Sequence, residues 1–342
     1  MLCKQRPLPA PVPNGPRSYL VRYFQQALNG SGLVVATNCI AETTGMLAAD
    51  ISEVVPPGHD PAFIDALLDV CRHHKIKLLC SLHDWEAPYI SDQKDRFTEI
   101  GVIPVIAEPD IIDVCLDKYK TWLFAKEYSI PFLESYINLD LVEHDLKSGV
   151  ISFPLILKPR LGHASIGLKK VWNKQQLLNA YEYLVQELEN QEFNCLAENN
   201  THHPIIVQPF SNGQEYGVDI VNDIKGNFAA CFVKHKLAMR SGETDAAETV
   251  SFPQIESVAR KLSSATRCPG NMDADFLVTN NGKIFLLEMN SRFGGGYPFS
   301  HEAGADVPAA LIAWAKGEKP DPNWLKIKPE VRCFKEIAML RA

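Results

Sequence analysis

The amino-acid sequence predicts a mixed fold, an α/β domain followed by an α+β body. Between Ser18 and Ile106 the hydrophobic spacing alternates between helical and strand-like periods, which predicts a parallel sheet covered by helices on both faces. From about Ser148 onward, longer strand-like runs are joined by hairpin turns, which predicts antiparallel strands combined with helices. At 342 residues the chain is too long for one small core and suits two or three subdomains.

The first part of the chain contains helices and short strands in alternation. Ser18 to Leu28 has helical spacing, and the run GLVVATN that starts at Gly32 is rich in β-formers. Asp60 to His74 gathers its apolar residues on one helical face and begins with an Asp-Pro start signal. The expected elements that follow are a strand at Ile76 to Leu82, a helix-to-strand passage at Arg96 to Ile106, and a helix pair from Ile111 to Glu127.

The second part is expected to contain longer strands. The turns at Asn222 to Asn227 and at Asn280-Asn281-Gly282 supply residues that tolerate positive φ, as hairpins require. The expected strands are Phe153 to Pro159, Ile205 to Pro209, Glu215 to Val221, Phe228 to Leu237, Asp273 to Thr279 and Ile284 to Met289. The expected helices are Leu177 to Glu189, Pro253 to Thr266 and Pro308 to Ala315.

Bulk composition narrows the classes of function. A formal charge of -7 leaves no basic surplus for phosphates, which argues against nucleic acid as the main partner. Nine cysteines, without regular spacing or a CxxC pair, indicate reduced thiols in the cytoplasm rather than disulfides or zinc. No apolar run approaches the roughly 18 residues of a membrane span, so no membrane association is expected. The start, MLCKQRPLPAPVPNGP, lacks the apolar core of a signal peptide and predicts an extended arm.

The segment LLEMNSRFGGG carries the strongest chemical signal. Glu288, Asn290 and Arg292 alternate at the end of a buried strand and therefore share one face, just before a glycine-rich loop. Asp275 lies across the Asn-Asn-Gly hairpin, so its carboxylate can reach the same end of the strand pair. Carboxylate and amide oxygens suit Mg2+ carrying a polyphosphate. The alternative for Asp275 is a structural ion pair with Arg292.

A second candidate is the end of the strand FPLILKP. Lys158 precedes the loop RLGHASIG, in which Gly162, Ser165 and Gly167 leave backbone N–H groups free to wrap phosphates. A lysine at the strand end would add a positive charge to the same phosphates. The alternative is an ordinary turn between strands with a solvated lysine.

Two further segments are weaker candidates. In PIIVQPFSNGQEYGVDI, a strand interrupted by Pro209 leaves backbone groups available to a planar ligand, and Glu215 could hold a ribose hydroxyl. The alternative is a β-bulge with a surface glutamate. In KHKLAMRSGETD, Lys236 and Arg240 flank a polar loop that could close over an anionic substrate. The alternative there is a solvated basic loop.

Taken in order, these segments resemble the ATP-grasp superfamily, and most of all stand-alone relatives of the carbamoyl phosphate synthetase large subunit. The landmarks run over nearly the whole chain, from about Gly15 to Gly317, and are DKYKTWLFAKEYSIP, FPLILKPRLGHASIGL, IIVQPFSNGQEYGVDI, RSGETDAAETV and DADFLVTNNGKIFLLEMNSRFGGG. Each is weak alone, but five in the right order and spacing are specific.

The resemblance implies a Rossmann-like N-terminal (pre-ATP-grasp) domain and then an ATP-grasp domain whose two lobes hold ATP between their sheets. The implied boundaries are an arm at 1–16, the Rossmann-like domain at 17–115, the ATP-grasp domain at 116–320 and a C-terminal segment at 321–342. Within the ATP-grasp domain, the small lobe covers about 150–210 and the large lobe about 211–320.

The resemblance also implies roles for particular residues. Lys118 and Lys158 resemble the basic residues on the ATP phosphates, and Gly162 to Gly167 resembles the phosphate loop. The residues that resemble the adenine hinge and the ribose ligand are Gln208, Pro209, Ser211 and Glu215. The residues that resemble the Mg2+ (or Mn2+) ligands are Asp275, Glu288 and Asn290. Arg292 resembles the residue that stabilises the transferring phosphoryl group, with Lys236 and Arg240 expected to close over the acyl substrate.

The implied reaction is ATP-dependent activation of a small carboxylate to an acylphosphate, which an amine attacks to give an amide. An amino acid or short peptide is the expected acid, and a homodimer is the expected assembly. One alternative is a carbamoyl-phosphate-synthetase-like kinase that forms carboxyphosphate or carbamoyl phosphate. Another is a non-catalytic ATP-binding protein, although four retained site residues argue against it.

Two departures from the family pattern stand out. Relatives usually begin with an apolar strand and a glycine-rich turn, whereas PLPAPVPNGPRSYL keeps only the turn-like end. A central strand of the first domain is therefore expected to be missing, altered or lost to a wrong start site. The chain also carries a single ATP-grasp unit, which disfavours complete carbamoyl phosphate synthesis.

Overall fold

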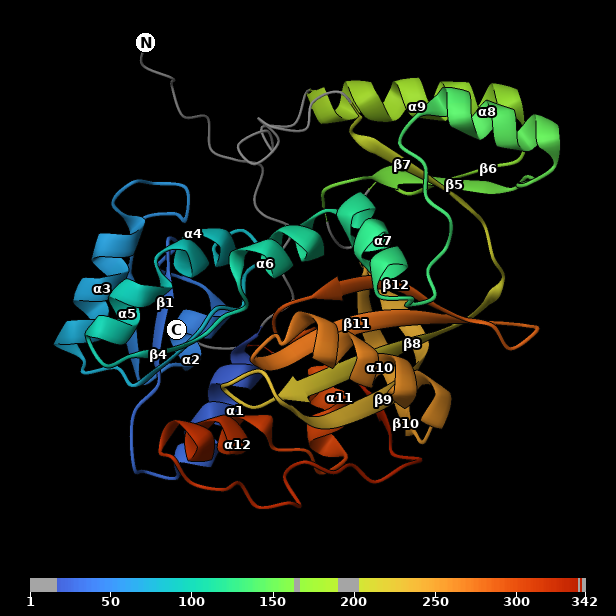
Figure 1. Cartoon of the computed structure of the whole chain (residues 1–342). Helices are drawn as coiled ribbons and strands as arrows, with labels where there is room; N and C mark the ends of the chain where they lie inside the picture. Colours follow the sequence, from blue (N-terminus) through green and yellow to red (C-terminus); the bar gives the residue numbers. More distant parts are fainter. Residues whose placement is uncertain (1–16, 163–166, 190–202, 338, 340–342) are drawn as a thin grey trace, which may run out of the picture.

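The computed structural model describes residues 17–162, 167–189, 203–337 and 339 (Figure 1). Parallel strand pairs occupy the first part, and two antiparallel sheets occupy the rest. The predicted combination of an α/β start and an α+β body is therefore confirmed. None of the helices in the described ranges is long and apolar enough to cross a membrane.

The first part contains two separate parallel strand pairs rather than one continuous sheet. β1 (Val35–Asn38) pairs with β2 (Ile51–Val54), and β3 (Leu78–Cys80) pairs with β4 (Ile103–Val105). No strand within the described residues joins the two pairs, which fits the expectation of a missing or altered central strand. The helices of this part are α1 (Ser18–Leu28), α2 (Thr44–Ala48), α3 (Phe63–His73), α4 (Ala87–Asp92) and α5 (Lys94–Glu99).

Two helices connect the first part to the rest. α6 (Pro109–Leu116) and α7 (Lys118–Glu127) meet at Asp117, whose side chain caps α7 by accepting from the N–H groups of Tyr119 and Lys120. An aspartate at this position satisfies helix donors that would otherwise lack partners. The cap therefore fixes where α7 begins. It also fixes the backbone position of Lys118, the first residue of this helix.

A three-stranded antiparallel sheet follows, in the order β6 (Lys169–Val171), β5 (Leu155–Pro159) and β7 (Ile205–Pro209). The helices α8 (Leu139–Ser148) and α9 (Lys174–Glu189) lie on one side of it (Figure 1). Apolar residues of these helices and strands form one buried cluster that includes Val142, Leu157 and Leu177. The sheet therefore presents its other side to the remainder of the molecule.

The larger sheet has six strands in the order β12-β11-β8-β9-β10-β13. Its strands are β8 (Gly213–Asn222), β9 (Phe228–Arg240), β10 (Glu243–Val250), β11 (Gly270–Thr279), β12 (Ile284–Asn290) and β13 (Arg332–Phe334). The remaining helices are α10 (Pro253–Thr266), α11 (Tyr297–Glu302) and α12 (Val307–Ala315).

The two faces of the six-stranded sheet differ in chemistry. Val218, Met272 and Ala274 point to the face that α10 covers and belong to a buried cluster with Ile255 of that helix. Because side chains alternate along a strand, the intervening residues point the other way. Those residues are mainly charged: Asp219, Lys234, Lys236, Asp273, Asp275 and Glu288.

Candidate active site

Acidic and amide side chains meet on the β11–β12 hairpin. The register places Asp275 opposite Glu288 and Asp273 opposite Asn290, so each pair projects from the same face. The Asn-Asn-Gly turn is formed as expected, with Gly282 at φ 79°. The structure thus brings together the three residues proposed as metal ligands, Asp275, Glu288 and Asn290.

Asp275 has a different partner from the one considered in the sequence analysis. Its carboxylate lies 2.6 Å from Nζ of Lys236, whose side chain is only 7% exposed, and Glu215 lies 3.7 Å from the same Nζ. The alternative of an Asp275–Arg292 pair is therefore wrong. Burial raises the pKa of Asp275 to about 7 against the effect of Lys236, with further upward contributions from Asp273 and Glu288. The carboxylates crowd one another enough to attract another cation.

The donor set fits a hard divalent cation. Two carboxylates and the Asn290 amide offer oxygen ligands of the type that Mg2+ accepts. The described residues contain no group of three or more His, Cys, Asp or Glu arranged for a metal, so the set depends on the amide and on non-protein oxygens. The crowding at Asp275 is the feature that a cation would relieve.

Arg292 is held by a residue that the sequence analysis did not identify. Its Nε and Nη2 donate to the two carboxylate oxygens of Asp84 at 2.9 and 2.8 Å, and its Nη1 lies 3.7 Å from Asp273. Burial alone would raise the pKa of Asp84, but the charge and hydrogen bonds of Arg292 lower it below its usual value. Asp84 follows β3 in the first domain, and no local pattern in SLHDWE singles it out.

The two lysines proposed for the phosphates are adjacent. Lys118 Nζ donates to the carbonyl of Gly162 at 2.5 Å. Burial and then the Lys118 charge lower the pKa of Lys158 to about 8, although Glu288 and Glu215 act in the opposite direction. Burial also lowers the pKa of Lys118, opposed chiefly by Glu288. Lys118 at the start of α7 and Lys158 on β5 are thus both close enough to Glu288 of the larger sheet for their charges to interact.

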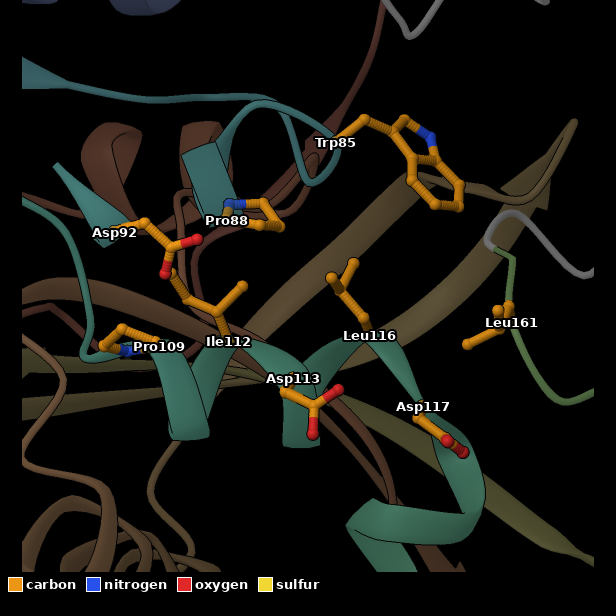
Figure 2. A pocket seen from close by; sticks show the side chains of 9 residues that line it. All are labelled: Trp85, Pro88, Asp92, Pro109, Ile112, Asp113, Leu116, Asp117 and Leu161. Carbon is orange, nitrogen blue, oxygen red and sulfur yellow. The ribbon is translucent and has the colours of Figure 1, made fainter. Parts of the chain in front are cut away.

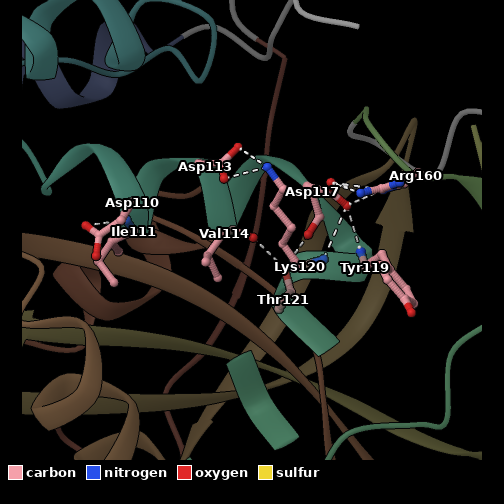
Figure 3. Close-up of polar contacts among 9 residues, drawn as sticks. All are labelled: Asp110, Ile111, Asp113, Val114, Asp117, Tyr119, Lys120, Thr121 and Arg160. Atoms are coloured by element: carbon pink, nitrogen blue, oxygen red, sulfur yellow. Dashed lines mark hydrogen bonds and ion pairs between the residues drawn. The ribbon is translucent and has the colours of Figure 1, made fainter. Parts of the chain in front are cut away.

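An ion pair holds the lysines in place (Figure 3). The guanidinium of Arg160 contacts both oxygens of the buried Asp117, with Nε donating at 2.8 and 2.9 Å and Nη2 lying 2.7 Å from the carboxylate. Lys118 N–H donates to the Arg160 carbonyl at 3.1 Å. The sequence analysis missed both members of this pair, although Asp before KYK is a recognisable helix cap. The pair fixes the start of α7 against the end of β5.

The phosphate-loop prediction is partly outside the described residues. Gly162 has φ 123° and Gly167 has φ 76°, values that favour glycine. A Cβ on Gly167 would also lie 2.9 Å from the Pro159 side chain, so this position has no room for a larger residue. Ser165 lies between them and outside the described residues.

The residues proposed for adenine and ribose lie where β7 leads into β8. The Gln208 side chain is buried and donates to Ser135 Oγ at 2.7 Å, so its amide serves packing. Pro209 is the last residue of β7, and Phe210 N–H donates to the Pro154 carbonyl at 3.0 Å. Ser211 follows in the connection, and Glu215 lies near the start of β8 with about half of its side chain exposed.

Within the described residues, none of the contacts of Arg240 connects it to this cluster. It ends β9, pairs with Asp245 across the β9–β10 hairpin, and its side chain is 44% exposed. Lys236, the other residue expected to close over the acyl substrate, does lie among the carboxylates. The role of Arg240 stays a prediction.

A pocket adjoins the cluster on the side of the first domain (Figure 2). In sequence order, the first lining residue is Trp85, which follows Asp84. The last two are Asp117 and Leu161, and Leu161 precedes Gly162. Its lining residues are Trp85, Pro88, Asp92, Pro109, Ile112, Asp113, Leu116, Asp117 and Leu161. The lining therefore includes residues adjacent in sequence to Asp84, Lys118 and Gly162.

A second buried ion pair lies deeper on the charged face. Lys234 and Asp219 contact each other with almost no exposure, and Ser300 of α11 donates to Asp219 at 2.5 Å. Asn271 donates to the other Asp219 oxygen at 3.2 Å. Buried charges require such partners, and this network holds α11 against the sheet.

Comparison with known families finds a match in two separate parts of the chain. Residues 12–106 match the family described as "PylC-like, N-terminal domain", and residues 201–336 match "ATP-grasp in the biosynthetic pathway with Ter operon". Residues 201–336 are therefore identified as an ATP-grasp family domain. A curated relative, the D-alanine–D-alanine ligase of Thermosipho africanus, is 29% identical over 200 residues, which are 52% of this chain and 50% of that protein. The chain thus matches about half the length of this relative.

Solved structures show the same ATP-grasp fold. The biotin carboxylase–β,γ-ATP complex from Campylobacter jejuni superposes with a TM-score of 0.70 at 15% identity, over 90% of this chain and 71% of that chain. The L-amino acid ligase from Bacillus licheniformis superposes with a TM-score of 0.66 at 15% identity, over 92% of this chain and 74% of that chain. These likenesses confirm the predicted fold.

Proposed function

We propose that this ATP-grasp chain is an ADP-forming carboxylate–amine ligase that activates a small acid as an acylphosphate. The observation that carries the proposal is the grouping of Asp275, Glu288 and Asn290 on one face of the β11–β12 hairpin. The charges of Lys118 and Lys158 are close enough to interact with Glu288 of this group. Cations on one side and crowded carboxylates on the other suit the polyphosphate of ATP with a divalent metal between them.

The residues divide into three proposed groups. The nucleotide-binding group is Lys118, Lys158, Gly162, Ser165, Gly167, Gln208, Pro209, Ser211 and Glu215. The metal group is Asp275, Glu288 and Asn290, which fit Mg2+ or Mn2+ by donor type. The group acting on the transferred phosphoryl and the acid is Arg292, Lys236 and Arg240. When bound, the metal would neutralise phosphate charge.

The side chains of the protein position reactants and compensate charge. Lys118 on α7 and Lys158 on β5 can bind phosphate oxygens, and their mutual repulsion favours the arrival of an anion. Arg292, fixed by Asp84, offers a guanidinium whose position is set before substrate binds. This arrangement favours orientation rather than covalent participation of a side chain.

The names of two relatives support an amino acid or short peptide as the acid. One is a D-alanine–D-alanine ligase, and the other is an L-amino acid ligase. The chain would then act on small-molecule carboxylates and amines. A homodimer and a cytoplasmic location stay predictions.

The test is phosphate release from ATP and Mg2+ with a panel of L-amino acids and D-alanine, with mass spectrometry of the products. An amide product with ADP and phosphate supports the proposal. Release that depends only on bicarbonate would replace it with the carboxyphosphate-forming alternative. Binding of ATP without turnover for any acid would replace it with the non-catalytic alternative.

Matched variants locate the activity in the site. Glu288→Ala and Arg292→Ala should each abolish turnover. Glu182→Ala on α9 and Arg22→Ala on α1 remove exposed charges of the same kind and should leave turnover unchanged. Equal loss in the control variants would indicate a general defect instead.

A further inference from the structure

A partly buried arginine of the first domain has a buried, unused donor near Arg292. Arg17 directly precedes α1, and its Nη1 donates to the carbonyl of Leu82, two residues before Asp84. Its Nε is buried and finds no hydrogen-bond acceptor among the residues that the structure describes. A buried charged donor without an acceptor costs free energy unless a ligand supplies one.

A second contact fixes this arginine relative to the glycine-rich loop. Tyr19 Oη donates to the Gly294 carbonyl at 3.3 Å, which binds the first turn of α1 to the segment that follows Arg292. That loop approaches closely, because a Cβ on Gly294 would overlap the Asp273 carboxylate. The start of α1, the Asp84 loop and the end of β12 therefore meet at one place.

The charges at this place leave Arg17 the less compensated arginine. Arg292 is held by both oxygens of Asp84 and lies near Asp273. Burial lowers the pKa of Arg17, and the nearby Arg292 charge lowers it further, although Tyr19, Asp84 and Glu243 act in the opposite direction. An additional anion at Arg17 would relieve both effects.

The geometry points to a carboxylate-binding subsite formed by Arg17 beside Arg292, with Tyr19 fixing the start of α1, and we propose that it holds the carboxylate of the acid substrate. This inference rests on the proposed ligase function and adds a binding group from the first domain. A planar guanidinium suits a carboxylate, which can accept two parallel N–H bonds. The phosphates have Lys118 on α7 and Lys158 on β5, so the arginine side is available to the acid.

Direct binding tests the subsite without turnover. The whole chain, labelled with 15N, is titrated with sodium acetate, L-alanine or D-alanine, with sodium chloride as the ionic-strength control, while the arginine Nε–H resonances are followed. The resonance that is absent in Arg17→Lys should shift with at least one carboxylate and not with chloride. No shift with any of the three, or an equal shift with chloride, overturns the subsite.

Kinetics separate this inference from the ligase proposal. With the acid identified by phosphate release, Arg17→Met should raise the KM for the acid at least about tenfold and leave the KM for ATP nearly unchanged. Arg17→Lys should recover part of the loss, and Arg22→Met on the exposed side of α1 should behave as the parent. Thermal unfolding of both methionine variants shows whether the fold is intact.

The outcomes are distinguishable. If the parent releases no phosphate with any acid, the ligase proposal fails. If the parent turns over and a folded Arg17→Met keeps the same KM for the acid, only the subsite fails.

Discussion

The two sides of the candidate site handle charge in opposite ways. On one side, burial lowers the pKa of both Lys118 and Lys158, and the Lys118 charge contributes to the lowering at Lys158. On the larger sheet, Asp275 contacts Lys236, and Arg292 contacts Asp84. Among the described residues, neither lysine forms an ion pair with a carboxylate, whereas the other side holds ion pairs already formed.

This difference indicates which side changes most when ligands bind. Phosphates would supply what the lysines lack, so their binding needs no existing contact to break. A metal at Asp275 would compete with Lys236, so its binding has to reorganise an ion pair at 2.6 Å. Lys118 and Lys158 can therefore bind phosphate without breaking an ion pair. At Asp275, Lys236 already supplies the positive charge that a metal would bring.

The largest expected effect comes from breaking the Asp84–Arg292 pair. Asp84→Ala leaves the largely buried Arg292 without its bidentate partner, and we expect a loss of about 3 kcal/mol in the free energy of unfolding. Urea denaturation measures it. Asp69→Ala, which removes the exposed partner of Arg72, should cost less than about 1 kcal/mol. Similar losses in the two variants would show that Asp84 is not a special partner.

Removing a cation from the small lobe should weaken nucleotide binding instead. Lys158→Met deletes a charged donor to the phosphates, for which we expect a loss of about 1.5 to 3 kcal/mol of binding free energy, at least about tenfold in Kd. Isothermal titration with ATP and Mg2+ measures the change. Stability should not fall, because the variant also removes repulsion with Lys118. Unchanged affinity would remove Lys158 from the phosphate site.

The pH dependence of ATP binding should follow the lowered pKa of Lys158. Since that pKa is about 8, roughly a tenth of the Lys158 side chains stay protonated one pH unit higher, so affinity should fall by up to about tenfold there. The Lys158→Met variant should lack this component. Titrations on both sides of the pKa test it, and a pH-independent Kd would contradict it.

Lys158 should also make the free energy of unfolding depend on pH. Its pKa is lower in the folded chain than in the unfolded chain, where lysine titrates near about 10.4. Between these values the unfolded state binds more protons, so this contribution to stability rises with pH. It is fully unfavourable below the folded pKa. Urea denaturation across this range should show the rise in the parent and a smaller one in Lys158→Met.

The smallest effect is expected at Arg240. Its pair with Asp245 is exposed on the β9–β10 hairpin, so Arg240→Ala should change stability by less than about 1 kcal/mol. ATP affinity should stay within about twofold of the parent. A selective rise in the KM for the acid, measured by phosphate release, would support the role predicted for Arg240 over the substrate.

Local signals in the sequence located the elements that carry most of the site. The predicted bounds of α1, β7 and α10 agree with the structure at both ends, because helical spacing and Pro start signals are local. The hairpin between β11 and β12 was predicted from its Asn-Asn-Gly turn. The facing of Asp275 and Glu288 followed from that turn alone.

Elements with weak patterns were missed. β10, with the sequence ETDAAETV, buries mainly alanine and threonine, so it lacks the apolar alternation that marks a strand. α8 has only Val142 fully buried, and β13 has three residues. In these segments tertiary contacts decide the structure, and the local sequence carries little of the information.

Partners between distant segments could not be predicted at all. The sequence gives no reason to join Arg292 to Asp84, Lys236 to Asp275, or Arg160 to Asp117, since each contact depends on how separate elements pack. Arg17 was not identified for the same reason. The residue types of the site could therefore be predicted, but their pairing could not.

The contact between Asp84 and Arg292 spans 208 positions of sequence. In a chimaera with a foreign first domain, the Arg292 guanidinium after β12 would lose its partner. The new domain would have to supply a carboxylate at the position of Asp84. The same holds for a fragment that begins at α6. The first domain and the body that follows it thus depend on each other for charge compensation, and neither can be replaced without regard to the other.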